Sequence, residues 1–162
     1  MSMIEISHII FGFSSLAFGL YILLTTKGTK LHKTIGKLYV ISMVLLNVTA
    51  FCIYDLFGGF GIFHWAAVVS SLTIAGGIGV LVLRNMIKNW LALHYELMVW
   101  SYIGLLAATS NEMFVHVPIF KELAKTFSPA PLISMLLVFS IGAWWEIKDK
   151  PRLTKRFLSM NK

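Results

Sequence analysis

The sequence predicts an all-α membrane protein, a polytopic bundle of five transmembrane helices. Hydrophobic residues make up 57% of the 162 residues and charged residues only 13%, whereas a soluble domain carries roughly a quarter charged residues. Five apolar stretches approach the ~20 residues that a helix needs to cross the hydrocarbon core. Because these stretches are continuous and do not alternate with polar residues, they favour helices over the strands of a membrane barrel.

The expected spans follow one another along the chain, separated by short turn-forming segments such as TTKGTK, DLFGGFG and SPAP. The first stretch has no basic segment before it and no clear cleavage site after it, so we interpret it as a retained span. Short connections predict antiparallel neighbours. We expect residues 1–147 to form one five-helix transmembrane domain and residues 148–162 a basic cytoplasmic tail. The predicted spans are residues 6–25, 35–54, 62–83, 91–114 and 130–147.

The basic residues predict the orientation of this bundle. Of the 14 lysines and arginines, all but Lys121 and Lys125 fall in the tail or in the first and third connections. An outside N-terminus and a cytoplasmic C-terminus place these residues in the cytoplasm, as the positive-inside rule requires. The net charge of +7 therefore needs no nucleic-acid partner, since anionic lipid headgroups already attract dispersed loop charges. The single Cys52 excludes an intrachain disulfide.

Small and polar residues inside the spans predict where the helices touch. Small side chains let helices approach closely in lipid, and Asn47 and Ser101 are expected to hydrogen-bond across the bundle. The rows of small residues are Gly12, Ser15 and Gly19; Ser71, Ala75 and Gly79; and Ser101, Gly104 and Ala108.

An outer layer of ionisable side chains is a candidate metal site. His8 and His64 begin the first and third spans from outside, and Glu112 and His116 lie four residues apart on one helix face. Asp55, at the outer end of the second span, is expected at the same depth in the membrane. Imidazole and carboxylate ligands suit Zn, Cu or Fe, and a glutamate inside a membrane is costly unless paired or functional. Alternatively these groups lie in headgroup water, or Glu112 and His116 pair with each other without a metal.

An inner layer offers a second candidate site for a cofactor. His32 and His94 begin the second and fourth spans, and Met98 follows His94 by one turn. The axial ligands of a b-type haem come from different helices, which His32 with His94, or His8 with His64, would satisfy. His94 and Met98 share a face, so they could instead hold Cu(I) together. The fourth helix reaches both layers, about 27 Å apart at 1.5 Å per residue.

Several short segments resemble a family of small bacterial membrane proteins of unknown function. The segments are KLHKTIGKLYVISM, FGIFHWAAVVSSLT and HYELMVWSYIGLLAA, within about the first 118 residues. They match an H-K/R-x-x-G-x-x-Y-V motif, a Phe–His pair and an H-x-x-x-M-x-x-S-Y motif. Many members of that family carry an arginine near the end of the fourth helix, where this chain has His116. The resemblance implies a membrane topology and a bacterial cytoplasmic (inner) membrane, and it names no reaction. The matching residues are His8, His32, Gly36, Tyr39, His64, His94, Met98, Ser101 and Tyr102.

Three function classes are compatible with these residues. The first is a membrane protein that binds a transition metal or haem b in a redox or metal-handling role. The second is an outward-facing zinc-dependent membrane hydrolase with Glu112 as general base. The third is a non-enzymatic accessory subunit of a membrane complex. Besides the lipid bilayer, the expected partners are a second copy of the chain or a larger membrane complex. The lack of an internal repeat argues against a stand-alone secondary transporter.

Overall fold

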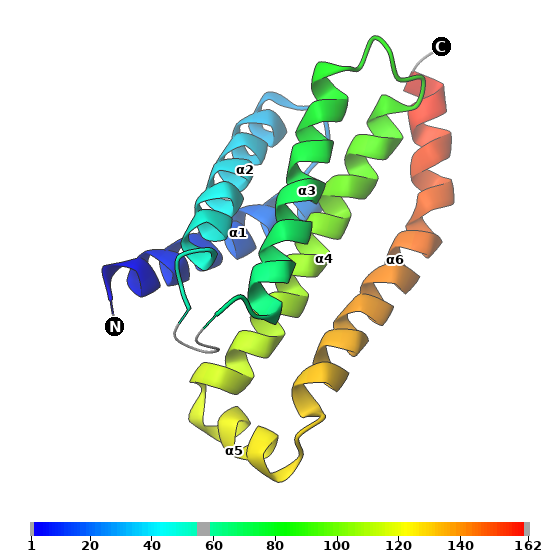
Figure 1. Ribbon diagram of the computed structural model, residues 1–162. Coiled ribbons are helices and arrows are strands. Elements are labelled where there is room, and N and C mark those ends of the chain that lie inside the picture. Colours follow the sequence, from blue (N-terminus) through cyan, green and yellow to red (C-terminus); the bar gives the residue numbers. More distant parts are fainter. Residues whose placement is uncertain (1, 55–58, 161–162) are drawn as a thin grey trace. The chain divides into compact units, whose positions relative to one another are not determined.

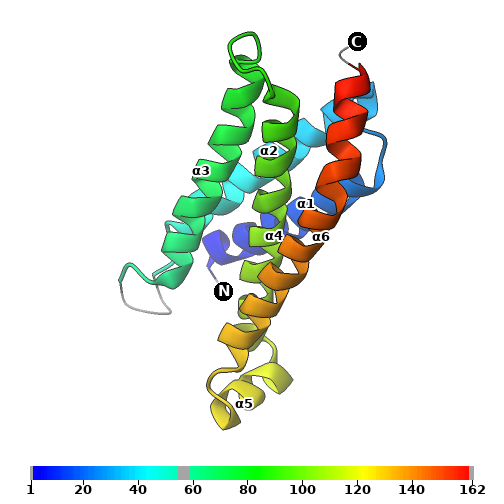
Figure 2. The ribbon, with the colours of Figure 1, turned by 90° about the vertical axis from the view of Figure 1, so that its right-hand side faces the viewer.

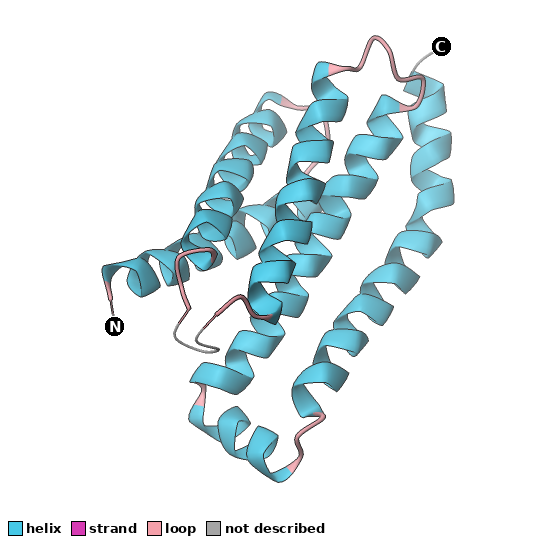
Figure 3. Ribbon diagram, in the orientation of Figure 1, coloured by secondary structure: helices cyan, strands magenta, loops and turns pink. Residues whose placement is uncertain are grey.

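The computed structural model describes residues 2–54 and 59–160, and every regular element in this part of the chain is a helix (Figure 3). This confirms the all-α class. The helices are α1 (Met3–Leu24), α2 (Lys30–Ala50), α3 (Ile62–Val82), α4 (Trp90–His116), α5 (Pro118–Thr126) and α6 (Ala130–Met160).

Four of the described helices, α1, α3, α4 and α6, have the length and apolar composition needed to cross a membrane. They fit an integral membrane protein, and each begins within three residues of a predicted span. The second span differs from the prediction, because α2 begins five residues earlier and ends at Ala50. The amides of Phe51, Cys52 and Ile53 bond back to carbonyls three or four residues earlier, closing the helix in a turn. Helix α6 continues to Met160, through most of the segment predicted as a tail.

The chain forms two compact units, residues 1–72 and 73–162. In the first unit α1 packs along α2 (Figure 1). Ser2 caps α1 in a reciprocal arrangement, since its hydroxyl accepts from the Glu5 amide and the Glu5 carboxylate accepts from the Ser2 amide. Thr29 caps α2 by accepting from the His32 amide at 3.1 Å. Such caps satisfy amides that have no partner within the helix.

The turn between α1 and α2 is stabilised by Lys27. Its ammonium donates to the carbonyls of Ile22, Leu23 and Thr25 at 2.5, 2.9 and 3.1 Å, where the last carbonyls of α1 lack helical partners. Partial burial lowers the pKa of Lys27 below its usual value. The following residue, Gly28, has φ +82°, the left-handed conformation that glycine adopts at low cost. The TTKGTK segment therefore reverses the chain as predicted.

Small and polar side chains hold the helices of the first unit together. Ser15 and Gly19 are buried in α1, and a Cβ added at Gly12 would lie 3.7 Å from Leu46 of α2. The row of small residues predicted in α1 thus faces α2. The Asn47 amide nitrogen donates to the hydroxyls of Ser70 and Ser71 in α3, both at 3.1 Å. This confirms the expected hydrogen bond across helices.

In the second unit α4 packs against α6, and both contact α5. Figure 2 shows α6 running back along α4, with the short α5 joining their ends. The two helices approach closely at Gly142 of α6, where an added Cβ would lie 2.8 Å from three side-chain atoms of Ile103. A second contact joins the hydroxyls of Ser134 and Ser110 at 3.4 Å.

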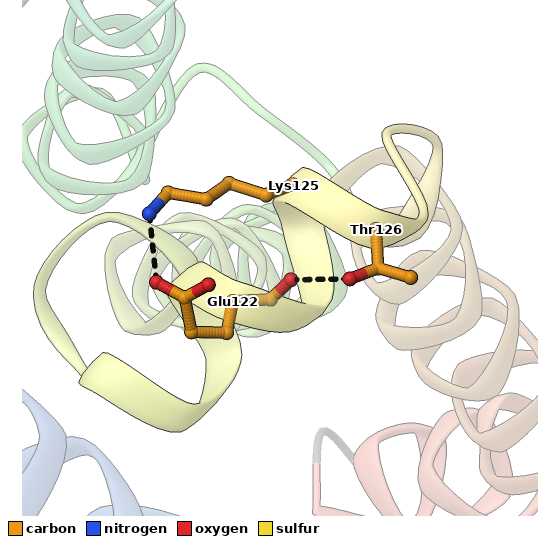
Figure 4. A network of polar contacts seen from close by, with 3 residues as sticks. All are labelled: Glu122, Lys125 and Thr126. Atoms are coloured by element: carbon orange, nitrogen blue, oxygen red, sulfur yellow. Dashed lines mark hydrogen bonds and ion pairs between the residues drawn. The ribbon is translucent and has the colours of Figure 1, made fainter.

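Helix α5 was not predicted, because its nine residues fell in a connection between spans. Pro118 stands in its first turn, where a missing amide hydrogen costs nothing. The Lys125 ammonium pairs with the Glu122 carboxylate at 2.7 Å, and the Thr126 hydroxyl donates to the Glu122 carbonyl at 3.0 Å (Figure 4). Its apolar residues Ile119 and Leu123 are exposed, as expected of an amphipathic helix at a membrane interface.

Candidate functional site

The imidazole of His94 is fixed by a backbone carbonyl. In the second unit its Nδ1 lies 2.8 Å from the carbonyl oxygen of Gly77 in α3. A carbonyl can only accept a hydrogen bond, so Nδ1 carries the proton and the neutral ring keeps its lone pair on Nε2. A metal-ligating histidine commonly has this arrangement, because its other N–H donates to a carbonyl or carboxylate that orients the ring.

Met98 lies one turn after His94 and approaches the same glycine. A Cβ added at Gly77 would lie 2.7 Å from the Met98 sulfur, which is closer than two such atoms can pack. Glycine at position 77 therefore lets α4 bring both an imidazole and a thioether against α3. The structure brings His94 and Met98 to one place, as their spacing predicted. Their roles as ligands stay predictions.

His64 has the opposite ring arrangement. Its Nδ1 accepts a hydrogen bond from the Gly61 amide at 3.0 Å, so the neutral ring carries its proton on Nε2. The side chain is 3% exposed, and Nε2 has no hydrogen-bond partner in the part of the chain that the structure describes. The rings of Tyr54 and Phe60 lie 4.6 and 4.9 Å away. His64 in this arrangement offers a donor, and ligating a metal would require it to release the Gly61 amide or the Nε2 proton.

An unpartnered N–H at this position has an energetic consequence. A buried donor without an acceptor costs about 1–3 kcal/mol, and such groups are uncommon enough in folded proteins that each needs a physical explanation. The neighbouring rings of Tyr54 and Phe60 recover part of this cost through packing. They do not supply an acceptor in the plane of the imidazole.

His8 joins α1 and α2 in the first unit. Its Nδ1 lies 3.0 Å from the Thr49 hydroxyl oxygen, which itself donates to the carbonyls of Leu45 and Leu46. Because the hydroxyl proton is committed to those carbonyls, the hydroxyl accepts from Nδ1. The neutral His8 ring, like that of His94, keeps its lone pair on Nε2. The half-buried His32 lies in the first turn of α2.

Glu112 and His116 lie in direct contact at the end of α4. The His116 Nε2 lies 3.0 Å from a Glu112 carboxylate oxygen; the His116 side chain is 73% exposed and that of Glu112 37%. This is the pairing without a metal that the four-residue spacing allowed. Asp55, the further neighbour suggested by depth, lies outside the described residues.

Residues 2–54 and 59–160 contain no group of three or more His, Cys, Asp or Glu side chains placed to hold a metal ion. His8 and His64 belong to the first unit, and Glu112 and His116 to the second. Convergence of these four on one metal stays a prediction. Among the described residues, His94 with Met98 has the donor set and ring orientation best suited to a ligand role.

Sequence reasoning missed two glycines that bond to these histidines and one buried carboxylate in α6. Gly77 bonds to His94 through its backbone carbonyl, and Gly61 bonds to His64 through its backbone amide. Such backbone contacts cannot be predicted from the side chains in the sequence. Glu146 is 7% exposed in α6. The sequence showed Glu146 as a single carboxylate at the end of an apolar stretch. We interpreted that stretch only as a membrane span.

One of the comparisons with known proteins identified a family, and it fits a membrane protein. The model of a family described as predicted membrane protein (DUF2306) matches residues 5–145. Neither the curated proteins nor the solved structures gave a match.

Proposed function

We propose that the chain, which belongs to the DUF2306 family of predicted membrane proteins, binds a transition metal or a b-type haem at His94 and serves a redox or metal-handling role. The observation that supports this is the 2.8 Å hydrogen bond from the His94 ring to the Gly77 carbonyl. It fixes the ring and leaves the Nε2 lone pair as the only acceptor on the imidazole.

Met98 limits which metals this site would favour. Its thioether is a soft ligand that favours Cu(I), and imidazole binds copper, iron and zinc alike. Both side chains project from one face of α4, so they cannot occupy opposite axial positions of a haem. With copper the two would be ligands together. If the group were haem, His94 would be one of its ligands and a second helix would have to supply another, for which His32 is the sequence-based expectation.

We further propose that the chain crosses the membrane five times, with its N-terminus outside. Helix α2 has 21 residues, which at 1.5 Å per residue spans about 31 Å. Its basic residues Lys30, Lys33 and Lys37 lie in the first two turns, where long side chains can extend to the headgroups. His94 then lies near the cytoplasmic end of α4, in the bacterial inner membrane.

The test is metal content in protein purified in detergent from native membranes without added metal. We expect about one iron, copper or zinc per chain in the wild type and a loss of most of it in His94→Ala. The matched control is Met113→Ala, because Met113 lies in the same helix, is 40% exposed and belongs to neither candidate ligand set.

Two further measurements identify the group. A haem absorption spectrum that persists in Met98→Leu indicates an iron porphyrin held by His94, whereas loss of copper in Met98→Leu indicates joint ligation. Metal content that is unchanged in His94→Ala, or no metal above background in the wild type, would contradict the proposal.

A further inference from the structure

The beginning of α3 contains a hydrogen-bond donor that has no acceptor among the described residues. Four observations meet at His64: the ring is 3% exposed, Nδ1 is occupied by the Gly61 amide, Nε2 has no partner in the described structure, and two aromatic rings cover the imidazole. All of these groups lie in the first unit. They share no residue with the site at His94, so a ligand bound at His64 would not depend on the proposed metal.

We propose that the Nε2–H of His64 is the docking point for the carbonyl oxygen of a membrane-soluble molecule. The Gly61 amide holds the ring in the form that donates from Nε2, so the complementary ligand atom is an acceptor. The apolar surroundings favour a neutral carbonyl over a carboxylate, whose burial would be expensive. Quinones and glycerolipid acyl esters both carry such a carbonyl beside a hydrocarbon tail.

The position of His64 suits a ligand that arrives from the bilayer. It lies in the first turn of α3, one of the helices long and apolar enough to cross a membrane, so its depth is near the boundary where ester carbonyls and quinone heads reside. The covering ring of Phe60 is 53% exposed, and glycines precede and follow it. Phe60 precedes Ile62, the first residue of α3, so its side chain is not part of the helix.

Binding can be tested with two probes on the full chain in dodecyl maltoside, a detergent that has no carbonyl group. One probe is a benzoquinone with a decyl tail, and the other is diheptanoyl phosphatidylcholine below its micelle concentration. Binding is measured by titration, and the His64 Nε2–H resonance is followed in protein carrying ¹⁵N-labelled histidine. Each variant is first checked for folding by its thermal unfolding transition.

The variants distinguish the effect of the His64 N–H from the effect of a buried ring at this position. His64→Phe keeps a buried ring and removes the N–H, and we expect it to weaken probe binding at least about tenfold. His64→Gln keeps an N–H at a comparable reach and should bind within about threefold of the wild type. His116→Phe changes a histidine at the end of α4 and serves as the matched control, with unchanged binding.

The outcomes either identify the ligand as a quinone or a lipid ester, or overturn the proposal. Loss of quinone binding in His64→Phe identifies a quinone-type ligand, and loss of phosphatidylcholine binding identifies a lipid ester. No binding of either probe, equal binding by wild type and His64→Phe, or an Nε2–H resonance that neither probe shifts would overturn it. Metal content measured on the same samples reports the site at His94 separately.

Discussion

At the scale of single residues, backbone groups determine what each histidine can do. His94 donates to the Gly77 carbonyl, whereas His64 accepts from the Gly61 amide. One ring is left with a lone pair and the other with an N–H, although both histidines begin apolar helices and look alike in the sequence. Sequence reasoning could identify both as candidates. It could not assign their opposite roles, because the deciding partners are main-chain atoms.

A polar contact at the same scale can be tested through stability. Asn47 is buried and donates to the hydroxyls of both Ser70 and Ser71. We expect Asn47→Ala to lower the free energy of unfolding in detergent by about 1–2 kcal/mol, since hydrogen bonds between membrane helices contribute about this much. Ser70→Ala removes one of the two bonds and should cost less. Equal stability of Asn47→Ala and the wild type would show that the two bonds contribute nothing net.

At the scale of helices, the length of the apolar stretches predicted where α1, α3, α4 and α6 begin. It did not predict where α2 ends, because a turn and not the end of the apolar stretch closes that helix. The second span was predicted to reach residue 54, but α2 closes in a turn after Ala50. Because of its charged residues we interpreted α5 as a connection, although it forms a helix that packs against α4 and α6. Hydropathy reports transfer into lipid and carries no information on a helix outside it.

Close packing between α4 and α6 gives a prediction at this scale. A Cβ at Gly142 would lie 2.8 Å from the Cδ1, Cγ1 and Cγ2 atoms of Ile103, and a β-branched side chain has little freedom to move away. Gly142→Ala should therefore lower the free energy of unfolding by about 1–3 kcal/mol.

Gly104→Ala is the matched control, because an added Cβ there meets nothing within 4 Å. We expect its thermal unfolding transition to match that of the wild type or to lie slightly higher. If both alanine variants unfold alike, α4 and α6 do not pack closely at Gly142.

At the scale of the whole molecule, composition alone predicted an all-helical membrane protein, and the family match over residues 5–145 agrees. Which candidate residues lie together was harder to predict. The pairing of Glu112 with His116 and the shared face of His94 and Met98 follow from helical spacing within one element. Contacts between elements, such as His94 with Gly77, depend on helix rotation and register, which hydropathy does not specify.

Topology is the prediction that belongs to the entire chain. Five crossings place the two termini on opposite sides of the membrane, whereas crossing by only α1, α3, α4 and α6 would place them on the same side. Alkaline phosphatase, which is active outside the cytoplasm, and a fluorescent protein that matures inside it can each be fused to either end. We expect phosphatase activity at the N-terminus and fluorescence at the C-terminus. The same reporter active at both ends would mean that α2 does not cross.

The opposite ring forms of His94 and His64 are the central claim, because the metal proposal depends on one and the carbonyl proposal on the other. Nitrogen-15 NMR of protein with ¹⁵N-labelled histidine, assigned with His94→Gln and His64→Gln, measures which ring nitrogen carries the proton. We predict protonated Nδ1 with unprotonated or metal-shifted Nε2 in His94, and protonated Nε2 with unprotonated Nδ1 in His64. Protonated Nε2 in His94, or a lone pair on Nε2 of His64, would contradict this claim.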